Sequence, residues 1–286
     1  MSRQTSSRVA VLGAGVMGTG IAALAVGSGV PVVLVDIDEE RLAKARAEVA
    51  RQVRLAQFLG HLSATTTAGE LETTTDLARV AGATAVIEAV TERMEAKAAA
   101  LAGASAVVAP GTLVVSNTSA VPIDELAQHV TRPADLVGIH FMNPPYLIRT
   151  VELIRGPRSG DAAIRAAEQL LAELGQASVL VGDGPGFVIN RILQRAINEA
   201  ARVVEEGIAT PEAVDAVFTG CLGHRSGPLA TGDLIGLDNV VDSLHVLLER
   251  TGDEGYRPCE LLLTKVKAGE FGRKTGRGFF DYEGAQ

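Results

Sequence analysis

Hydrophobic residues occur in short runs over the first two thirds of the chain, and longer stretches with helical spacing lie between these runs. Short apolar runs that end at glycine or polar residues predict buried strands, at residues 8–12, 31–35, 85–88, 112–115 and 136–139. Helices are predicted between them, at 16–27, 38–59, 93–101 and 122–128. Two further strands are expected at 151–154 and 179–181, and the polar residues 65–75 are interpreted as a loop. Strands that alternate with helices predict an α/β fold with a doubly wound parallel sheet.

The pattern changes after residue 182. Residues 183–186 combine aspartate, glycine and proline, a cluster that breaks regular structure. Beyond it the helical spacing continues almost to the end, with helices predicted at 187–206, 211–218, 229–250 and 258–268. Pro211 suits the first turn of its helix. We therefore expect a sheet domain at 1–182 and an all-α domain at 183–286.

The composition fits a globular protein with two domains. A chain of 286 residues is long enough for two, because a domain usually has about 100–200 residues. Hydrophobic residues make up 47% and charged residues 21%, which is ordinary for a protein with a large core. The formal net charge of −8 argues against a general nucleic-acid binder, which needs a basic face. It does not exclude a local site for an anionic ligand.

The cysteines and the N-terminus bear on the cellular location. Cys221 and Cys259 form no disulfide framework, so we expect a reducing cytoplasm. Residues 1–7 are polar and lack the apolar core of a signal peptide. No run of about 18 apolar residues predicts a membrane span. The sequence predicts a cytoplasmic protein, and we expect no metal site.

A glycine-rich loop follows the first predicted strand and opens the first predicted helix. It reads Gly13-Ala14-Gly15-Val16-Met17-Gly18. Gly13 permits a tight turn, Gly15 lets the backbone approach a pyrophosphate, and Gly18 lets the helix pack on the sheet. The free N–H groups at the helix start then bind the phosphates. This context predicts a Rossmann-type dinucleotide site, with Val16 and Met17 also at the cofactor.

Asp36 indicates which dinucleotide is bound. It ends the second predicted strand, at about the distance of 20 residues expected for a carboxylate that binds the adenosine ribose hydroxyls. A carboxylate there repels a 2′-phosphate, and no basic residue follows until Arg41. The sequence therefore favours NAD over NADP.

His140 and Glu152 are the candidate acid–base pair. His140 stands at the end of a predicted strand, at the edge of a parallel sheet where ligands bind. Glu152 lies on an apolar segment after the next turn, where a carboxylate needs a partner. We predict that Glu152 orients His140 as a general base. With a nicotinamide cofactor, such a pair suits the oxidation of an alcohol by hydride transfer.

Many ordered motifs together resemble the L-3-hydroxyacyl-CoA dehydrogenase family, including bacterial 3-hydroxybutyryl-CoA dehydrogenases. The resemblance runs nearly end to end. It is carried by Gly13–Gly18, Val86-Ile87-Glu88-Ala89-Val90, Ser116-Asn117-Thr118-Ser119, His140–Pro144, Gly184-Pro185-Gly186-Phe187, Asn190-Arg191, Gly227-Pro228-Leu229, Asp233–Asp238 and Gly272–Phe279.

The resemblance implies further site residues and an assembly. His140 would take the proton from the 3-hydroxyl, and Ser119 and Asn190 would hold the substrate oxygen. Family positions that contact the NAD cofactor are Glu92, Lys97, Ser119, Asn143 and Lys274. The resemblance also implies a homodimer formed through the helical domain.

Three alternatives stay open or are opposed by the sequence. Relatives often have lysines in the segment 53–62, whereas this chain has one arginine, one histidine and no lysine there. This difference leaves two carriers open for the thioester, coenzyme A and an acyl carrier protein. The latter would be a glyceryl- or seryl-type unit in polyketide extender biosynthesis. A non-catalytic NAD-binding sensor or structural protein is the alternative of another class. Related enzymes with a lysine base are opposed, because residues 188–195 contain no lysine.

Overall fold

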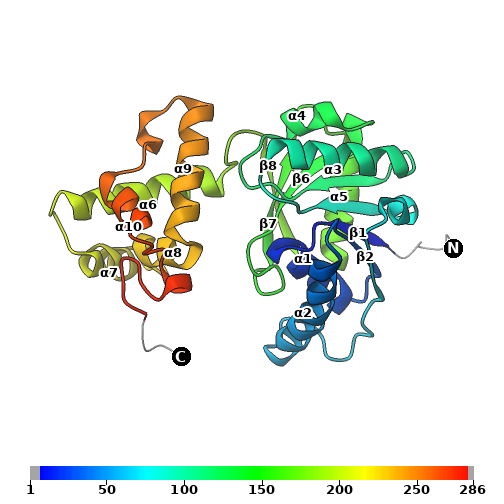
Figure 1. The fold of residues 1–286 in the computed structure, drawn as a ribbon, viewed down its shortest axis with the longest axis horizontal. Helices are drawn as coiled ribbons and strands as arrows, with labels where there is room; N and C mark the ends of the chain where they lie inside the picture. The colour runs from blue at the N-terminus through cyan, green and yellow to red at the C-terminus, as the bar shows by residue number, and fades with distance from the viewer. Residues whose placement is uncertain (1–6, 283–286) are drawn as a thin grey trace. The chain divides into compact units, whose positions relative to one another are not determined.

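The computed structural model describes residues 7–282, and the chain divides into two compact units. One unit ends at Gly184 and the other starts at Pro185, two residues later than the boundary expected from the breaker cluster. Figure 1 shows the elements of both units along the colour gradient.

The first unit is built on an eight-stranded sheet. Its strands are β1 (Val9–Leu12), β2 (Val32–Val35), β3 (Leu71–Thr74), β4 (Ala85–Glu88), β5 (Leu113–Ser116), β6 (Leu136–His140), β7 (Thr150–Arg155) and β8 (Ala177–Gly182). Their order is β3-β2-β1-β4-β5-β6-β7-β8. The first six run parallel in the Rossmann arrangement, so the predicted fold class is confirmed.

Helices cover both faces of this sheet. They are α1 (Val16–Gly27), α2 (Glu39–Phe58), α3 (Met94–Val107), α4 (Ile123–Leu126) and α5 (Asp161–Glu173), with 3-10 turns η1 (Leu77–Gly82), η2 (Ala127–His129) and η3 (Pro133–Asp135). Because successive strand residues point to opposite faces, Val9 and Val11 pack in one core and Ala10 and Leu12 in another.

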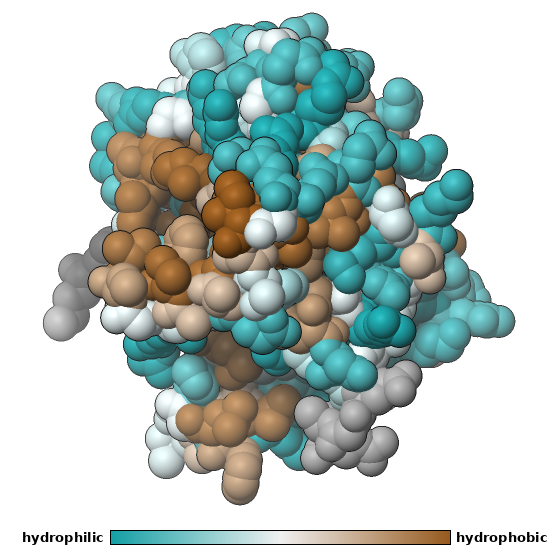
Figure 2. Space-filling view, turned by 90° about the vertical axis from the view of Figure 1, so that its left-hand side faces the viewer, coloured by the Kyte–Doolittle hydropathy of each residue, from teal (hydrophilic) through white to brown (hydrophobic). Residues whose placement is uncertain are grey.

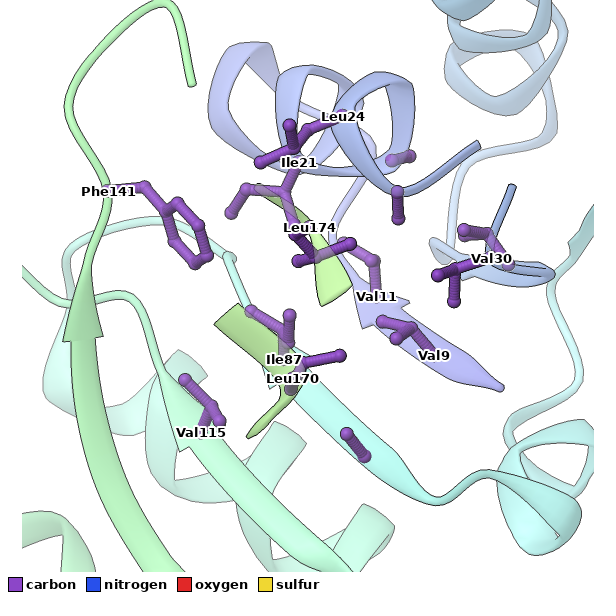
Figure 3. Close-up of a cluster of buried hydrophobic side chains, with 14 of the residues drawn as sticks. Val9, Val11, Ile21, Leu24, Val30, Ile87, Val115, Phe141, Leu170 and Leu174 are labelled. Carbon is purple, nitrogen blue, oxygen red and sulfur yellow. The ribbon is translucent and has the colours of Figure 1, made fainter. Parts of the chain in front are cut away.

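The larger core lies beneath α1, α2 and α5. Figure 3 shows part of this cluster, with Val11 and Ile87 on strands and Ile21 and Leu24 on α1. The smaller core packs the other face against α3 and η1. Each fully buried aliphatic side chain stabilises the fold by roughly 1.5–3 kcal/mol. The packed sheet therefore supports the loops at the ends of its strands.

The structure corrects the predicted elements of the first unit in four places. Residues 65–75 are not all loop, because β3 pairs with β2 inside them. Its sequence Leu-Glu-Thr-Thr is half-buried at the sheet edge and lacks an apolar run. The sheet is not wholly parallel, since β7 pairs antiparallel with β6. The helix α5 was not predicted, and the helix expected at 122–128 is a short α4 followed by a 3-10 turn.

The second unit is helical, as predicted. It contains α6 (Ile189–Glu205), α7 (Pro211–Leu222), α8 (Pro228–Ile235), α9 (Leu237–Thr251) and α10 (Glu260–Lys267), with the 3-10 turns η4 (Glu254–Tyr256) and η5 (Arg273–Thr275). Its own core gathers Ile197, Leu229, Val240 and Leu244. The single helix expected at 229–250 is wrong, because Gly236 has φ +100° and separates α8 from α9.

Membrane insertion of a helix finds no support in the described part of the chain. Among residues 7–282, no helix combines the length and the apolar character needed to span a bilayer.

Candidate active site

The carboxyl ends of the parallel strands bring the predicted site residues of the first unit to one edge of the sheet. β1 and β4 are neighbours, although two strands and two helices separate them in the sequence. The strand order reverses at this point, and open α/β sheets bind ligands in the crevice there. The glycine loop follows β1, so it lies at this crevice.

The glycines of the loop are required by the backbone around them. Gly13 has φ +100°, and a Cβ on it would lie 2.7 Å from the carbonyl oxygen of Ala89. A Cβ on Gly18 would lie 1.8 Å from the carbonyl oxygen of Gly13. Around Gly15 the space is open, because a Cβ there would have no described atom within 4 Å. Gly13 and Gly18 therefore shape the loop, while Gly15 leaves room for a ligand.

The start of α1 fits a dinucleotide pyrophosphate. Gly15 is the N-cap residue and gives the helix no side-chain cap, so the first N–H groups of α1 are left for a ligand. Val16 follows with 70% of its surface exposed, and Met17 is half-buried. An uncapped helix start beside open space is the arrangement that binds phosphate groups.

Asp36 follows β2 and is buried next to the glycine loop. Its Oδ2 accepts a hydrogen bond from Ala14 N at 2.7 Å, and its Oδ1 accepts one from Asp38 N at 3.0 Å. The guanidinium of Arg41 lies 3.8 Å from Oδ2. The carboxylate thus has a fixed orientation at the end of β2, where the adenosine ribose is expected.

His140 and Glu152 form the predicted pair. They are the last residue of β6 and the third residue of β7, and the antiparallel register places them directly opposite each other. His140 Nδ1 lies 2.7 Å from Glu152 Oε2, and both side chains are buried. A carboxylate that accepts from Nδ1–H fixes the imidazole tautomer and leaves Nε2 as the acceptor nitrogen.

Glu92 holds the turn that carries Ser119. Its Oε1 accepts hydrogen bonds from Ser119 N at 2.8 Å, from Ala120 N at 3.1 Å and from the Thr118 hydroxyl. Its Oε2 lies 3.0 Å from Lys97 Nζ. Burial would raise the pKa of Glu92, but the charge of Lys97 and these hydrogen bonds hold it below its usual value. Glu92 is therefore an anion at neutral pH, bound to the Ser119 turn.

Glu88 is a residue that the sequence analysis did not single out for the site. It is fully buried at the end of β4, and Lys97 Nζ lies 3.0 Å from its Oε1. Lys97, predicted at a cofactor contact, is itself only 1% exposed and lies between Glu88 and Glu92. A charged residue at the end of the apolar run Ala-Val-Ile-Glu was the available signal, because a buried carboxylate needs a partner.

The remaining predicted residues lie on loops or in the second unit. Asn143 is exposed after β6 and precedes Pro144 through a cis peptide bond. Asn190 is half-buried in the first turn of α6. Lys274 lies in η5, where its Nζ is 2.5 Å from Asp238 Oδ2. The roles of these three residues stay predictions. Within residues 7–282, no three His, Cys, Asp or Glu side chains gather as a metal site would require.

Comparison with known proteins identifies the family. The NAD-binding domain of 3-hydroxyacyl-CoA dehydrogenase matches residues 8–184, and the C-terminal domain of the same family matches residues 186–282. This chain belongs to the 3-hydroxyacyl-CoA dehydrogenase family. Its first unit is thus an NAD-binding domain, and the cofactor predicted from Gly13–Gly18 and Asp36 is confirmed as NAD.

Relatives within the family match over nearly the whole chain. A 3-hydroxybutyryl-CoA dehydrogenase of Bradyrhizobium diazoefficiens is 40% identical over 283 residues, which cover 98% of this chain and 96% of the relative. A probable 3-hydroxybutyryl-CoA dehydrogenase of Deinococcus radiodurans is 39% identical over 274 residues, covering 95% and 99%. The crystal structure of (S)-3-hydroxybutyryl-CoA dehydrogenase from Ralstonia eutropha matches with a TM-score of 0.90 and 37% identity, covering 97% and 99%.

Proposed function

We propose that this protein catalyses the reversible NAD-dependent oxidation of a short 3-hydroxyacyl-CoA to the 3-oxoacyl-CoA. The observation that carries the proposal is the buried hydrogen bond between His140 and Glu152, on the strand-end edge of an NAD-binding domain. Relatives that match end to end are named as 3-hydroxybutyryl-CoA dehydrogenases, which supports a short acyl chain on coenzyme A.

The proposed chemistry separates proton transfer from hydride transfer. NAD⁺, when bound, would supply the acceptor for the hydride of the carbinol carbon. His140 Nε2 removes the proton of the 3-hydroxyl, while Nδ1–H keeps its bond to Glu152. The carboxylate stabilises the imidazolium that forms. In the reducing direction, protonated His140 returns the proton to the oxygen, so lower pH favours reduction.

Substrate orientation is assigned to Ser119 and Asn190. Ser119 lies on the turn held by Glu92, and a hydroxyl in that place suits a hydrogen bond to the substrate oxygen. Asn190, in the second unit, has an amide of matching chemistry. Glu92, Lys97, Asn143 and Lys274 are assigned to the cofactor side of the site, on the family resemblance.

Initial rates of NADH oxidation test the proposal. Purified protein is offered acetoacetyl-CoA and, in parallel, a three-carbon 3-oxoacyl thioester on an acyl carrier protein. We expect strong turnover at micromolar acetoacetyl-CoA and weak turnover of the carrier-linked ester. Preference for the carrier-linked ester would contradict the CoA assignment, and turnover of neither substrate with NADH still bound would favour a non-catalytic NAD-binding protein.

The proposal extends to the assembly, which we propose is a homodimer formed through the second unit. Exposed large hydrophobic side chains of this unit are Val188, Ile192, Ile208, Val217, Leu222 and Leu234. Figure 2 shows hydrophobic residues gathered among polar ones on the face that it displays. Burial of such side chains stabilises association. Light scattering after size exclusion should give twice the 29.7 kDa of one chain, and a monomer would contradict this assignment. The cytoplasmic location stays a prediction.

A further inference from the structure

Two carboxylates and one ammonium lie together at the carboxyl end of β4, the strand next to β1. Lys97 Nζ lies 3.0 Å and 3.3 Å from the two carboxylate oxygens of Glu88, and 3.0 Å from Glu92 Oε2. Glu88 and Lys97 are 0% and 1% exposed. Burial of a charged group is unfavourable unless the group is paired and hydrogen-bonded. The two side chains therefore have few other conformations in which both charges keep a partner.

The sheet itself fixes Glu88. Glu88 ends β4 and Ser116 ends β5, and the parallel register places them side by side. The Ser116 hydroxyl donates to Glu88 Oε2 at 2.5 Å, and Val90 N donates to Oε1 at 2.8 Å. Lys97 Nζ contacts both oxygens of this carboxylate. Oε2 therefore has partners in Ser116 and Lys97, and Oε1 has partners in Val90 and Lys97. Glu88 has one orientation, and it determines where the ammonium lies.

The ammonium in turn fixes Glu92, the member of the cluster nearest to solvent. Its side chain is 38% exposed, so without a partner it would populate several rotamers. Lys97 holds Oε2, which directs Oε1 at the backbone N–H groups of Ser119 and Ala120. A displacement of the ammonium would be passed to Glu92 and then to the turn that carries Ser119.

We propose that Glu88 is a positioning residue, which sets Lys97 and Glu92 and through them the Ser119 turn for cofactor and substrate. The proposal rests on the proposed function, in which Glu92 and Ser119 contact the cofactor and the substrate. The competing interpretation is that Glu88 only neutralises a buried lysine and so stabilises the fold.

Two substitutions separate position from charge. Glu88→Gln keeps the shape of the side chain and removes its charge, whereas Glu88→Asp keeps the charge and withdraws the carboxylate by one methylene. Positioning predicts that both variants lose affinity for NADH and lose kcat/KM for acetoacetyl-CoA, each by about ten-fold or more, since small displacements near reacting groups cost factors of this size. Neutralisation alone predicts that the folded Glu88→Asp protein binds NADH as the wild type does.

The measurements are an NADH fluorescence titration, kcat and KM determined separately, and the thermal midpoint of each variant. Asp215→Asn is the matched control, because Asp215 is a buried carboxylate of the second unit that accepts from Leu229 N and Ala230 N. We expect it to lower the thermal midpoint and to leave the Kd of NADH unchanged. Wild-type Kd values in folded Glu88 variants would overturn the proposal.

Ser116→Ala keeps the proposal testable if both Glu88 variants fail to fold. It retains every charge of the cluster and removes the hydrogen bond to Glu88 Oε2, together with the longer one that Ser116 Oγ accepts from Thr118 N at 3.3 Å. Positioning predicts a measurable rise in the Kd of NADH and a fall in kcat/KM, and unchanged values would overturn it. If the wild type binds NADH but does not reduce acetoacetyl-CoA, the proposed function fails, while the NADH titrations still decide the role of Glu88.

Discussion

At the scale of single residues, the proposed chemistry depends on individual hydrogen bonds. The clearest case is His140, whose Nδ1 is committed to Glu152 over 2.7 Å. Because both side chains are buried, water does not easily replace either partner. The pair therefore acts as one unit, and each member should matter for turnover without contributing to cofactor affinity.

Replacing His140 with alanine should lower kcat by about 10²–10⁴, the usual contribution of a general acid–base group. Glu152→Gln should also lower kcat strongly, because an amide can donate to Nδ1 and then leave the hydrogen on Nε2, the wrong tautomer. Steady-state kinetics with acetoacetyl-CoA and NADH check both changes. The Kd of NADH should remain near that of the wild type, and near-normal kcat in His140→Ala would refute the assignment of the base.

We expect Asp36 and its neighbour Arg41 to set the preference between NAD and NADP. The carboxylate repels a 2′-phosphate, while the guanidinium 3.8 Å away has the chemistry to bind one. Asp36→Asn should therefore weaken the binding of NADH and reduce the preference of the protein for NADH over NADPH. Adding Arg41→Ala should remove any gain for NADPH. Titrations with both cofactors check this. An unchanged ratio of the Kd values of NADH and NADPH in Asp36→Asn would count against the assignment of Asp36 to cofactor choice.

The glycine loop shows how an element combines folding with binding. Gly18 and Gly15 lie three residues apart, yet their surroundings differ completely. Gly18→Ala places a methyl group 1.8 Å from the Gly13 carbonyl oxygen, so the loop or α1 must shift. Gly15→Ala meets nothing within 4 Å and should be tolerated by the fold.

The two alanine variants should therefore separate stability from affinity. Gly18→Ala should lower the free energy of unfolding by about 1–3 kcal/mol, the usual cost of overpacking. Gly15→Ala should leave the thermal midpoint within a few degrees of the wild type and raise the Kd of NADH, because its methyl occupies space left for the pyrophosphate. Thermal melting and NADH titration of both variants check this pair. Equal losses of stability in the two variants would contradict the assignment of Gly15 to cofactor binding and Gly18 to the fold.

Elements with strong apolar runs could be predicted from the sequence, and weakly patterned ones could not. β1, β2, β4, β5 and β6 are buried along their whole length, so their runs stand out. The half-buried β3 at the sheet edge gives no such run. Gly236 ends a helix whose spacing continues on both sides of it, because a positive φ is not visible in hydrophobic spacing.

The candidate site was predictable where chemistry follows a motif. The glycine loop follows β1, His140 ends β6 and Glu152 lies on β7, and all three were identified as candidates from spacing and residue type. The pairing of Lys97 with Glu88 was not, because it depends on how the turn after β4 places the start of α3 against the end of that strand. Contacts of that kind depend on the packed fold, which one sequence does not display.

At the scale of the whole molecule, each unit has a hydrophobic core of its own. The cores of the first unit contain residues from β1 to α5, and the core of the second unit contains residues from α6 onward. The chain divides between Gly184 and Pro185. A unit with its own core has what it needs to fold alone.

A fragment of residues 1–184 should therefore fold and bind NADH without turnover of acetoacetyl-CoA. Lys274, assigned to the cofactor side of the site, is absent from this fragment, so we expect it to bind NADH with a higher Kd than the full chain. Asn190, assigned to the substrate, is absent as well. Circular dichroism should show a cooperative thermal transition, and NADH fluorescence should report binding. A fragment that aggregates or lacks a transition would show that the second unit is required for the first to fold.

The reversal of chain direction at β7 has a consequence for how this enzyme can change over time. It places the proposed acid–base pair in a hairpin, whose two strands set the distance between His140 and Glu152 by register. Of the connecting residues 141–149, Phe141 and Tyr146 belong to the core, whereas Ile148 and Arg149 are exposed and can be exchanged while the pair stays aligned. Sequence change can thus accumulate at the exposed positions of the connection, while the strands keep the inherited pair in place.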